Sequence, residues 1–169
     1  SFYNLHGESY ANSMQIDFGY ELFDRFDIKL AYKINDVHTT YKEEDRVAPL
    51  TPKNRALVNI AYASNFEKWK FDVTWNYIGE SRIPAHLVNA ESEKLTFGNS
   101  DPFYLINAQI TKRFRKFDVY LGGENLLSYM QENPIIDAAN PDDDLFDASL
   151  IHAPVMGRTI YAGIRYKIK

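Results

Sequence analysis

The chain has 169 residues, a formal net charge of −4 and no cysteine, which excludes disulfide scaffolds and thiolate chemistry. No apolar run approaches the ~18 residues of a membrane-spanning helix, so a helical membrane protein is excluded as well. Because the balance of charge is slightly acidic and no run of Lys or Arg stands out, nucleic acid is not expected as a partner.

The predicted elements are strands, because apolar and polar residues alternate with a period of two along most of the chain. In the first run Met14 and Ile16 alternate with Gln15 and Asp17, whereas the third run is the weakest because Leu57 interrupts its polar side. A helix would need apolar residues at three- and four-residue spacing. In these runs that spacing would place apolar and polar residues together on one face. An aromatic content of 15% suits strands. In chain order, the seven predicted strands are residues 14–22, 26–35, 56–63, 69–77, 104–113, 117–124 and 160–168.

Connections between the runs alternate in length. Short connections join the first to the second run, the third to the fourth and the fifth to the sixth, whereas the other three are long and polar. Short turns on one rim and long loops on the other are typical of membrane β-barrels. Alternation over about eight to ten residues also fits strands of ~9–11 residues that cross a bilayer. The sequence therefore predicts an all-β fold of antiparallel transmembrane β-barrel strands.

The two faces of these strands differ in chemistry. In a membrane barrel the apolar set faces lipid and the charged set lines a wet interior, whereas a soluble barrel would turn the apolar set inward. Aromatic residues near the ends of the runs are candidates for interfacial girdles. These aromatic residues are Tyr20, Trp69, Trp75, Tyr77, Tyr104 and Tyr166. The glycine pair at 122–123 lies within a predicted strand, where it indicates close approach or curvature.

The number of predicted strands is odd, which indicates how much of a barrel the chain forms. If the short turns are periplasmic, the C-terminus is periplasmic and the first of seven strands begins outside the cell. Because bacterial single-chain barrels have an even number of strands, we expect residues 1–169 to be the C-terminal part of a barrel domain, with earlier strands upstream.

The last fifty residues resemble the C-terminal end of TonB-dependent outer-membrane receptors. Their sequence is similar to that of receptors from Bacteroidetes-type bacteria. Residues 49–55 are similar to the proline-containing end of an extracellular loop in that family, and the chain departs from it by closing on Ile168 and Lys169 instead of an aromatic residue. The segments that carry the resemblance at the ending are 123–129 (GENLLSY), 131–135 (QENPI), 145–149 (LFDAS), 154–158 (PVMGR) and 161–166 (YAGIRY).

This resemblance implies a barrel of about 22 strands closed by an N-terminal plug, with the plug outside the present sequence. It implies active uptake of a scarce nutrient, such as a siderophore, haem or cobalamin complex, across the outer membrane of a Gram-negative bacterium. The partners that it implies are outer-membrane lipid, TonB acting through the plug, the nutrient ligand and an extracellular lipoprotein. Two alternatives stay open: a passive porin-like or structural outer-membrane barrel, and a soluble β-barrel binding protein.

No catalytic constellation is present, so we expect neither an enzyme nor a cofactor. Ligand contact in a receptor would come from the long loops and the upper lumen, and position alone selects Arg82, His86, Asn99, Tyr129 and Arg158. An acidic loop offers oxygen ligands for calcium, although its spacing does not match an EF-hand. The candidate calcium ligands are Asp142, Asp143, Asp144 and Asp147.

Overall fold

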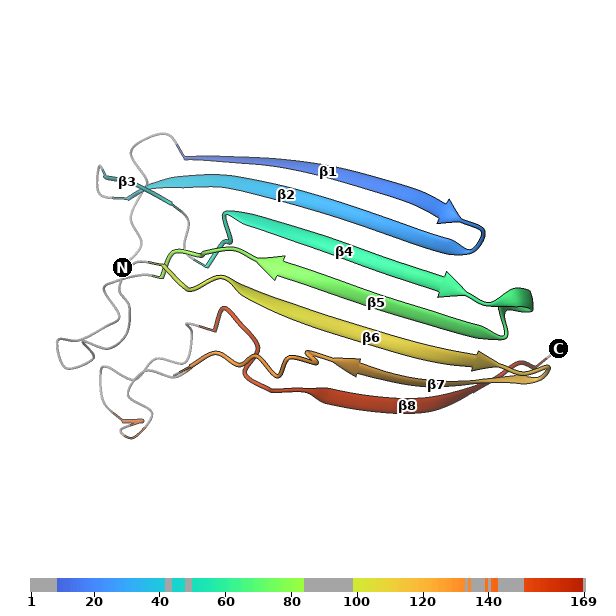
Figure 1. The fold of residues 1–169 in the computed structure, drawn as a ribbon. Coiled ribbons are helices and arrows are strands. Elements are labelled where there is room, and N and C mark those ends of the chain that lie inside the picture. The colour runs from blue at the N-terminus through green and yellow to red at the C-terminus, as the bar shows by residue number, and fades with distance from the viewer. Residues whose placement is uncertain are drawn as a thin grey trace.

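A computed structural model describes residues 9–41, 44–47, 50–83, 99–132, 134, 139, 141–142 and 151–168. In this part of the chain the fold is all-β: seven long strands form one antiparallel meander in chain order, and a short eighth strand pairs with β2 (Figure 1). No helix of the described residues is long and apolar enough to cross a membrane. The strands are β1 (Tyr10–Phe23), β2 (Phe26–Tyr41), β3 (Glu44–Val47), β4 (Asn54–Ala63), β5 (Trp69–Ile78), β6 (Phe103–Arg113), β7 (Phe117–Glu124) and β8 (Thr159–Tyr166), with a 3₁₀ turn at Asn65–Glu67.

All seven predicted strands are confirmed, in the predicted order and antiparallel. The strands β1 and β2 run further toward the long connections than predicted, because their backbone pairing continues to Tyr10 and His38 after the apolar alternation has ended. The sequence did not predict β3. This strand pairs with residues 38–41 of β2, and its charged sequence carries no alternation.

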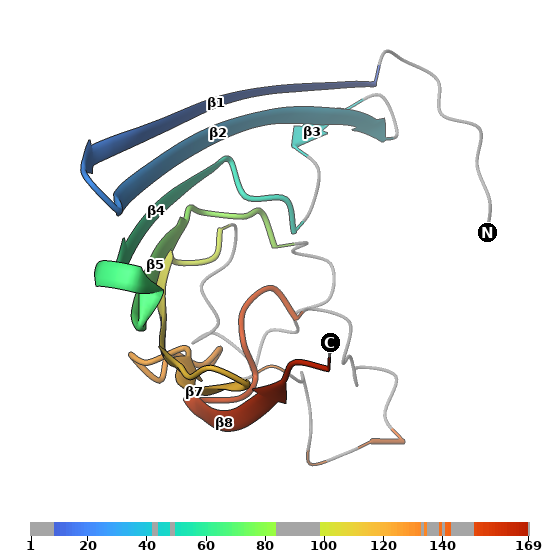
Figure 2. The same ribbon diagram turned by 90° about the vertical axis from the view of Figure 1, so that its right-hand side faces the viewer.

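The sheet curves into a trough and does not close on itself. Figure 2 shows β1 and β8 at the two edges of the arc, with the segment before β8 folded into its concave side. Closure into a larger barrel therefore stays a prediction. The three short connections lie together at one end of the strands, and the strand ends that border the long connections lie at the other (Figure 1). These ends are called the turn end and the loop end below.

Two tyrosines pack over glycines where β7 meets β8. A Cβ on Gly122 would lie 2.4 Å from the ring of Tyr161, and a Cβ on Gly163 would lie 2.4 Å from the hydroxyl of Tyr120. The two tyrosine rings meet edge to face with centroids 6.3 Å apart. The expected close approach at the glycine pair 122–123 is confirmed, because the Tyr161 ring fills the space beside Gly122 and the side chain of Leu126 would lie 2.6 Å from a Cβ on Gly123.

The polar set of side chains lies on the concave face. The segment 151–154 enters the concave side (Figure 2) and borders a groove with Leu57 and Asn76. Both residues alternate along their strands with the apolar set, which must therefore lie on the convex face.

The convex face is apolar and nothing in the described part of the chain covers it. Its side chains remain widely exposed, for example Ile16 at 58%, Ile164 at 71% and Leu121 at 52%. Among the described residues only Phe103 and Ala153 are buried hydrophobics. The accessible surface is 12501 Å², whereas a compact monomer of this mass would expose about 8,600 Å². The described part of the chain therefore buries very few hydrophobic side chains.

Candidate functional site

The concave face carries two grooves of different chemistry. The groove at the turn end has a volume of about 620 Å³ and is lined by side chains of both signs, including Glu21, Asp27, Asp72 and Lys70. Amides add hydrogen-bond partners, since the side chain of Asn59 on β4 donates to Asp72 at 3.1 Å. The acids in this lining outnumber the bases, with Glu21, Asp27, Glu67 and Asp72 against Arg25 and Lys70, so this groove is acidic.

A chain of ion pairs runs along the turn end of the trough. Glu67 accepts from Lys70 at 3.1 Å and pairs with Arg113, and Lys167 donates to the buried Asp118 at 3.0 Å. The bond to Lys70 and its charge, followed by the charge of Arg113, lower the pKa of Glu67 below 4.5. These contacts link the turns after β4 and β6 to the end of β8, so they hold neighbouring strands together at this rim.

The groove at the loop end is cationic and partly apolar. Its volume is about 640 Å³, and Lys33 and Arg55 line it together with Leu57, Leu105 and Phe103. Lys33 and Arg55 are direct partners across the β2–β4 register, which places two like charges side by side on one face. Of the described residues that line this groove, none is acidic.

Two amide side chains hold the segment before β8 against the trough. The Asn125 side chain donates to the carbonyls of Tyr129 at 2.7 Å and Met156 at 3.2 Å. The Gln131 Oε1 accepts from the backbone N–H of His152 at 2.9 Å and from that of Ala153 at 3.2 Å. Because a buried amide that loses such partners is costly, these bonds fix residues 151–154 at the rim of the loop-end groove.

Tyr129 packs flat on Phe103. The two rings are stacked with centroids 4.7 Å apart and planes 3° from parallel. Burial raises the pKa of the Tyr129 phenol above 10.0, and the charges of Asp101 and Glu132 add to the effect. The ring thus caps the buried Phe103 at the loop end.

The predicted ligand residues fall into two groups. Arg82 and Asn99 come together as partners of an isolated antiparallel bridge, and the side chain of Asn99 donates to Glu80 at 3.2 Å. Tyr129 and Arg158 lie in the two segments that the hydrogen bonds described above hold together. There the Arg158 N–H donates to the Ser128 hydroxyl at 3.4 Å. His86 lies outside the described residues. Ligand contact by all five stays a prediction.

The calcium prediction falls mostly outside the described part of the chain. Asp142 is exposed in a turn, whereas Asp143, Asp144 and Asp147 lie beyond the described residues. In the residues that are described, no cluster of three or more His, Asp or Glu side chains could hold a metal ion.

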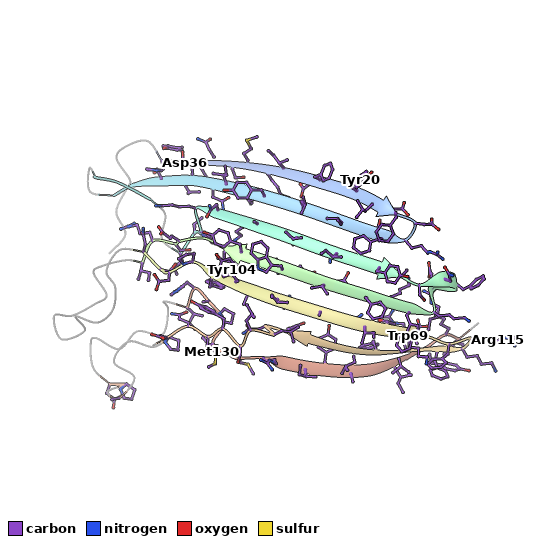
Figure 3. All side chains as sticks on the ribbon, in the orientation of Figure 1. Tyr20, Asp36, Trp69, Tyr104, Arg115 and Met130 are labelled. Atoms are coloured by element: carbon purple, nitrogen blue, oxygen red, sulfur yellow. The ribbon has the colours of Figure 1, made fainter. Side chains whose placement is uncertain are left out.

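Aromatic residues form a row along the turn end of the convex face. Trp69 lies at this end and Tyr104 near the other (Figure 3). At the loop end, Trp75 stacks on Tyr104 with ring centroids 5.5 Å apart, and the ring of Tyr77 is tilted against Tyr104 at 5.3 Å. The predicted girdle residue Tyr20 lies opposite Ile28, one outward position from the turn-end row. Ring contacts along this row join Phe23, Phe26, Tyr62, Phe71 and Trp69, then Phe114 and Phe117, with Lys112 over Trp69 at 4.6 Å and over Phe114 at 5.3 Å.

This row drifts along the strands from one edge of the sheet to the other. Phe26 shares a hydrogen-bonded row with Leu121 of β7, yet the aromatic of β7 is Phe117, four residues nearer to its turn. On β8, Tyr166 lies four residues beyond Ala162 in the same sense. Strands that tilt against a flat boundary show such a stagger.

Sequence reasoning missed the residues that shape the loop-end groove. In the sequence, Leu57 interrupts the polar side of its strand. In the structure, its apolar side chain lines the groove with Phe103, Ile151 and Pro154. The broken alternation was the available signal. Asn125 and Gln131 form hydrogen bonds to a segment more than twenty residues further along the chain. The sequence around each amide therefore does not predict these bonds.

Comparison with known proteins adds no assignment. A search against protein-family models gives no match, and no curated protein matches the chain.

Proposed function

We propose that this chain forms part of the wall of an outer-membrane β-barrel, as the C-terminal portion of a TonB-dependent receptor that imports a nutrient complex. The membrane location is supported by the convex face, which is apolar, exposed and bordered by aromatic residues. The concave face opposite it is polar. Receptor type and active uptake rest on the sequence resemblance of residues 123–166.

The dimensions of the apolar face suit a bilayer. On β1 it runs from Met14 to Leu22; nine residues at ~3.4 Å each extend about 30 Å along the strand. With the strand tilted by ~40°, this length spans about 23 Å, close to the ~25 Å apolar band of such barrels. Lipid would cover the exposed side chains that the chain itself leaves bare.

The curvature argues against the soluble alternative. A soluble barrel fills its concave interior with apolar side chains. Here Asp72, Asn107 and Gln109 line the concave side, while Ile60 and Val73 lie on the convex face at 40% and 42% exposure. A soluble protein would need a further layer over that face.

Active and passive transport differ in their energy requirement. The experiment uses the whole protein that carries this chain. In liposomes it is tested for spontaneous flux of a small sugar, and in cells for accumulation of ferric siderophore, haem or cobalamin with and without TonB. We expect no spontaneous flux, and uptake of one cargo that disappears without TonB. Rapid sugar flux with no TonB requirement would support the porin-like alternative instead.

A further inference from the structure

The loop-end groove differs from the rest of the concave face in its charge. Lys33 and Arg55 face each other across the β2–β4 register. Like charges placed directly opposite destabilise a sheet, and the ion pairs among the described residues include neither of them. At the turn end, by contrast, Lys70 has Glu67 as its partner.

The same groove presents an apolar surface beside its cations. Leu57 and Leu105 lie on the groove wall with the buried ring of Phe103 and the side chain of Ile151. The last of these comes from the segment that the Gln131 amide holds in place through the neighbouring His152 and Ala153. Apolar side chains on a wet face lose hydration only if something apolar covers them.

Amide groups complete the lining. Gln15 of β1 and Asn76 of β5 lie on opposite sides of the cation pair. The Asn76 amide can donate hydrogen bonds to an oxygen anion, whereas the Gln15 amide donates to Asp17 at 2.9 Å. The volume of about 640 Å³ is within the ~300–1,000 Å³ typical of small-molecule sites. The groove thus offers positive charge, an amide donor and an apolar surface.

We propose that the loop-end groove binds a small organic anion whose apolar or aromatic part rests on Leu57 and Leu105 while its carboxylate or similar oxyanion lies between Lys33 and Arg55. This proposal rests on the proposed function, since a ligand reaches the groove where the concave face lines a passage. It names the class of compound that the passage selects at its loop end.

The test uses the whole protein in lipid nanodiscs, where no detergent competes for apolar probes. Isothermal titration measures 2-naphthoate, the neutral 2-naphthamide, the cationic 2-naphthylmethylammonium and acetate. Wild type is expected to bind 2-naphthoate at least about tenfold more tightly than 2-naphthamide, a gap of about 1.4 kcal/mol. Acetate, which lacks the ring, and the cationic probe are expected to bind more weakly than 2-naphthoate.

The variants separate charge from shape. K33Q/R55Q is expected to bind 2-naphthoate and 2-naphthamide equally, and L57S to weaken both by about threefold or more. The matched control K29Q/R165Q removes the same charge from concave positions outside this groove and should keep the wild-type preference. Circular dichroism confirms that each variant is folded.

Three results would overturn the proposal: a preference that survives in K33Q/R55Q, one that is lost equally in K29Q/R165Q, or no binding of 2-naphthoate by wild type at millimolar concentration. These outcomes are distinct from failure of the proposed function. A protein that inserts into bilayers but shows no anion preference leaves the barrel wall standing without this site. One that binds 2-naphthoate in plain buffer and does not insert contradicts the membrane role alone.

Discussion

Gly122 shows how one residue sets the packing of the last two strands. The ring of Tyr161 lies where a Cβ would be, and its hydroxyl donates to the Gln109 side chain at 3.1 Å on the neighbouring β6. Any side chain at position 122 must push the ring aside and break that bond. A glycine inside a strand is otherwise unfavourable, so here its benefit is the space that it leaves.

Replacement of Gly122 by alanine should therefore destabilise the sheet by about 1–3 kcal/mol, the usual cost of overpacking. The control is G19A, because no atom lies within 4 Å of a Cβ at that position; there alanine should be neutral or stabilise by up to about 1 kcal/mol. Urea unfolding in lipid vesicles measures both. Equal effects of the two substitutions would refute the role given to Tyr161.

Tyr129 predicts a dependence on alkaline pH. Because its pKa in the folded chain is raised above 10.0, the folded state keeps the phenol proton at a pH where the unfolded chain has lost it. The contribution to stability is present below pH ~10 and is lost as the pH rises through the folded pKa. Wild type should lose more stability than Y129F between pH ~8 and pH ~11, measured by the urea midpoint. Identical losses would show that this tyrosine is not coupled to folding.

At the scale of the strand, the two faces should respond differently to charge. Val73 lies on the convex face of β5 opposite Ile60 and Ala108, in the middle of the apolar band. V73R should cost about 2–4 kcal/mol in a bilayer, whereas the rim control Y166R should cost about 0–1 kcal/mol. Reversible unfolding in vesicles measures both, and an equal cost at the two positions would argue against a buried midplane.

Strand identity could be predicted from the sequence because it depends on local alternation. Each run from 14–22 to 160–168 is a strand in the structure. The strand β3 could not be found in this way, since backbone pairing with β2 creates it and its side chains show no period. Nor could the position of residues 151–154, which depends on bonds from the distant Gln131.

The candidate site was predictable only in outline. A polar inner face followed from the alternation, and Arg82 and Asn99 do meet at the loop end. The division of the trough into an acidic groove and a cationic one depends on register, because register alone brings Lys33 beside Arg55. One residue of slip would send every side chain to the opposite face.

At the scale of the molecule, the described strands form an open trough with one exposed apolar face. Among the described residues its two edge strands, β1 and β8, each have a neighbouring strand on one side only, so further strands could pair there. Its exposed convex face needs an apolar cover, either lipid or a further layer of protein. Both needs are met if lipid covers the outside and further strands extend the edges.

The most direct test asks which face of β5 meets lipid. The chain has no cysteine, so single cysteines can be placed one by one from Phe71 to Trp75 in the whole protein, spin-labelled and reconstituted in bilayers. Collision with oxygen, which concentrates in lipid, should be high at Phe71, Val73 and Trp75, whereas a water-soluble nickel chelate should reach labels at Asp72 and Thr74. Alternation in the opposite sense, or equal access of both reagents along the strand, would contradict the membrane-facing convex surface.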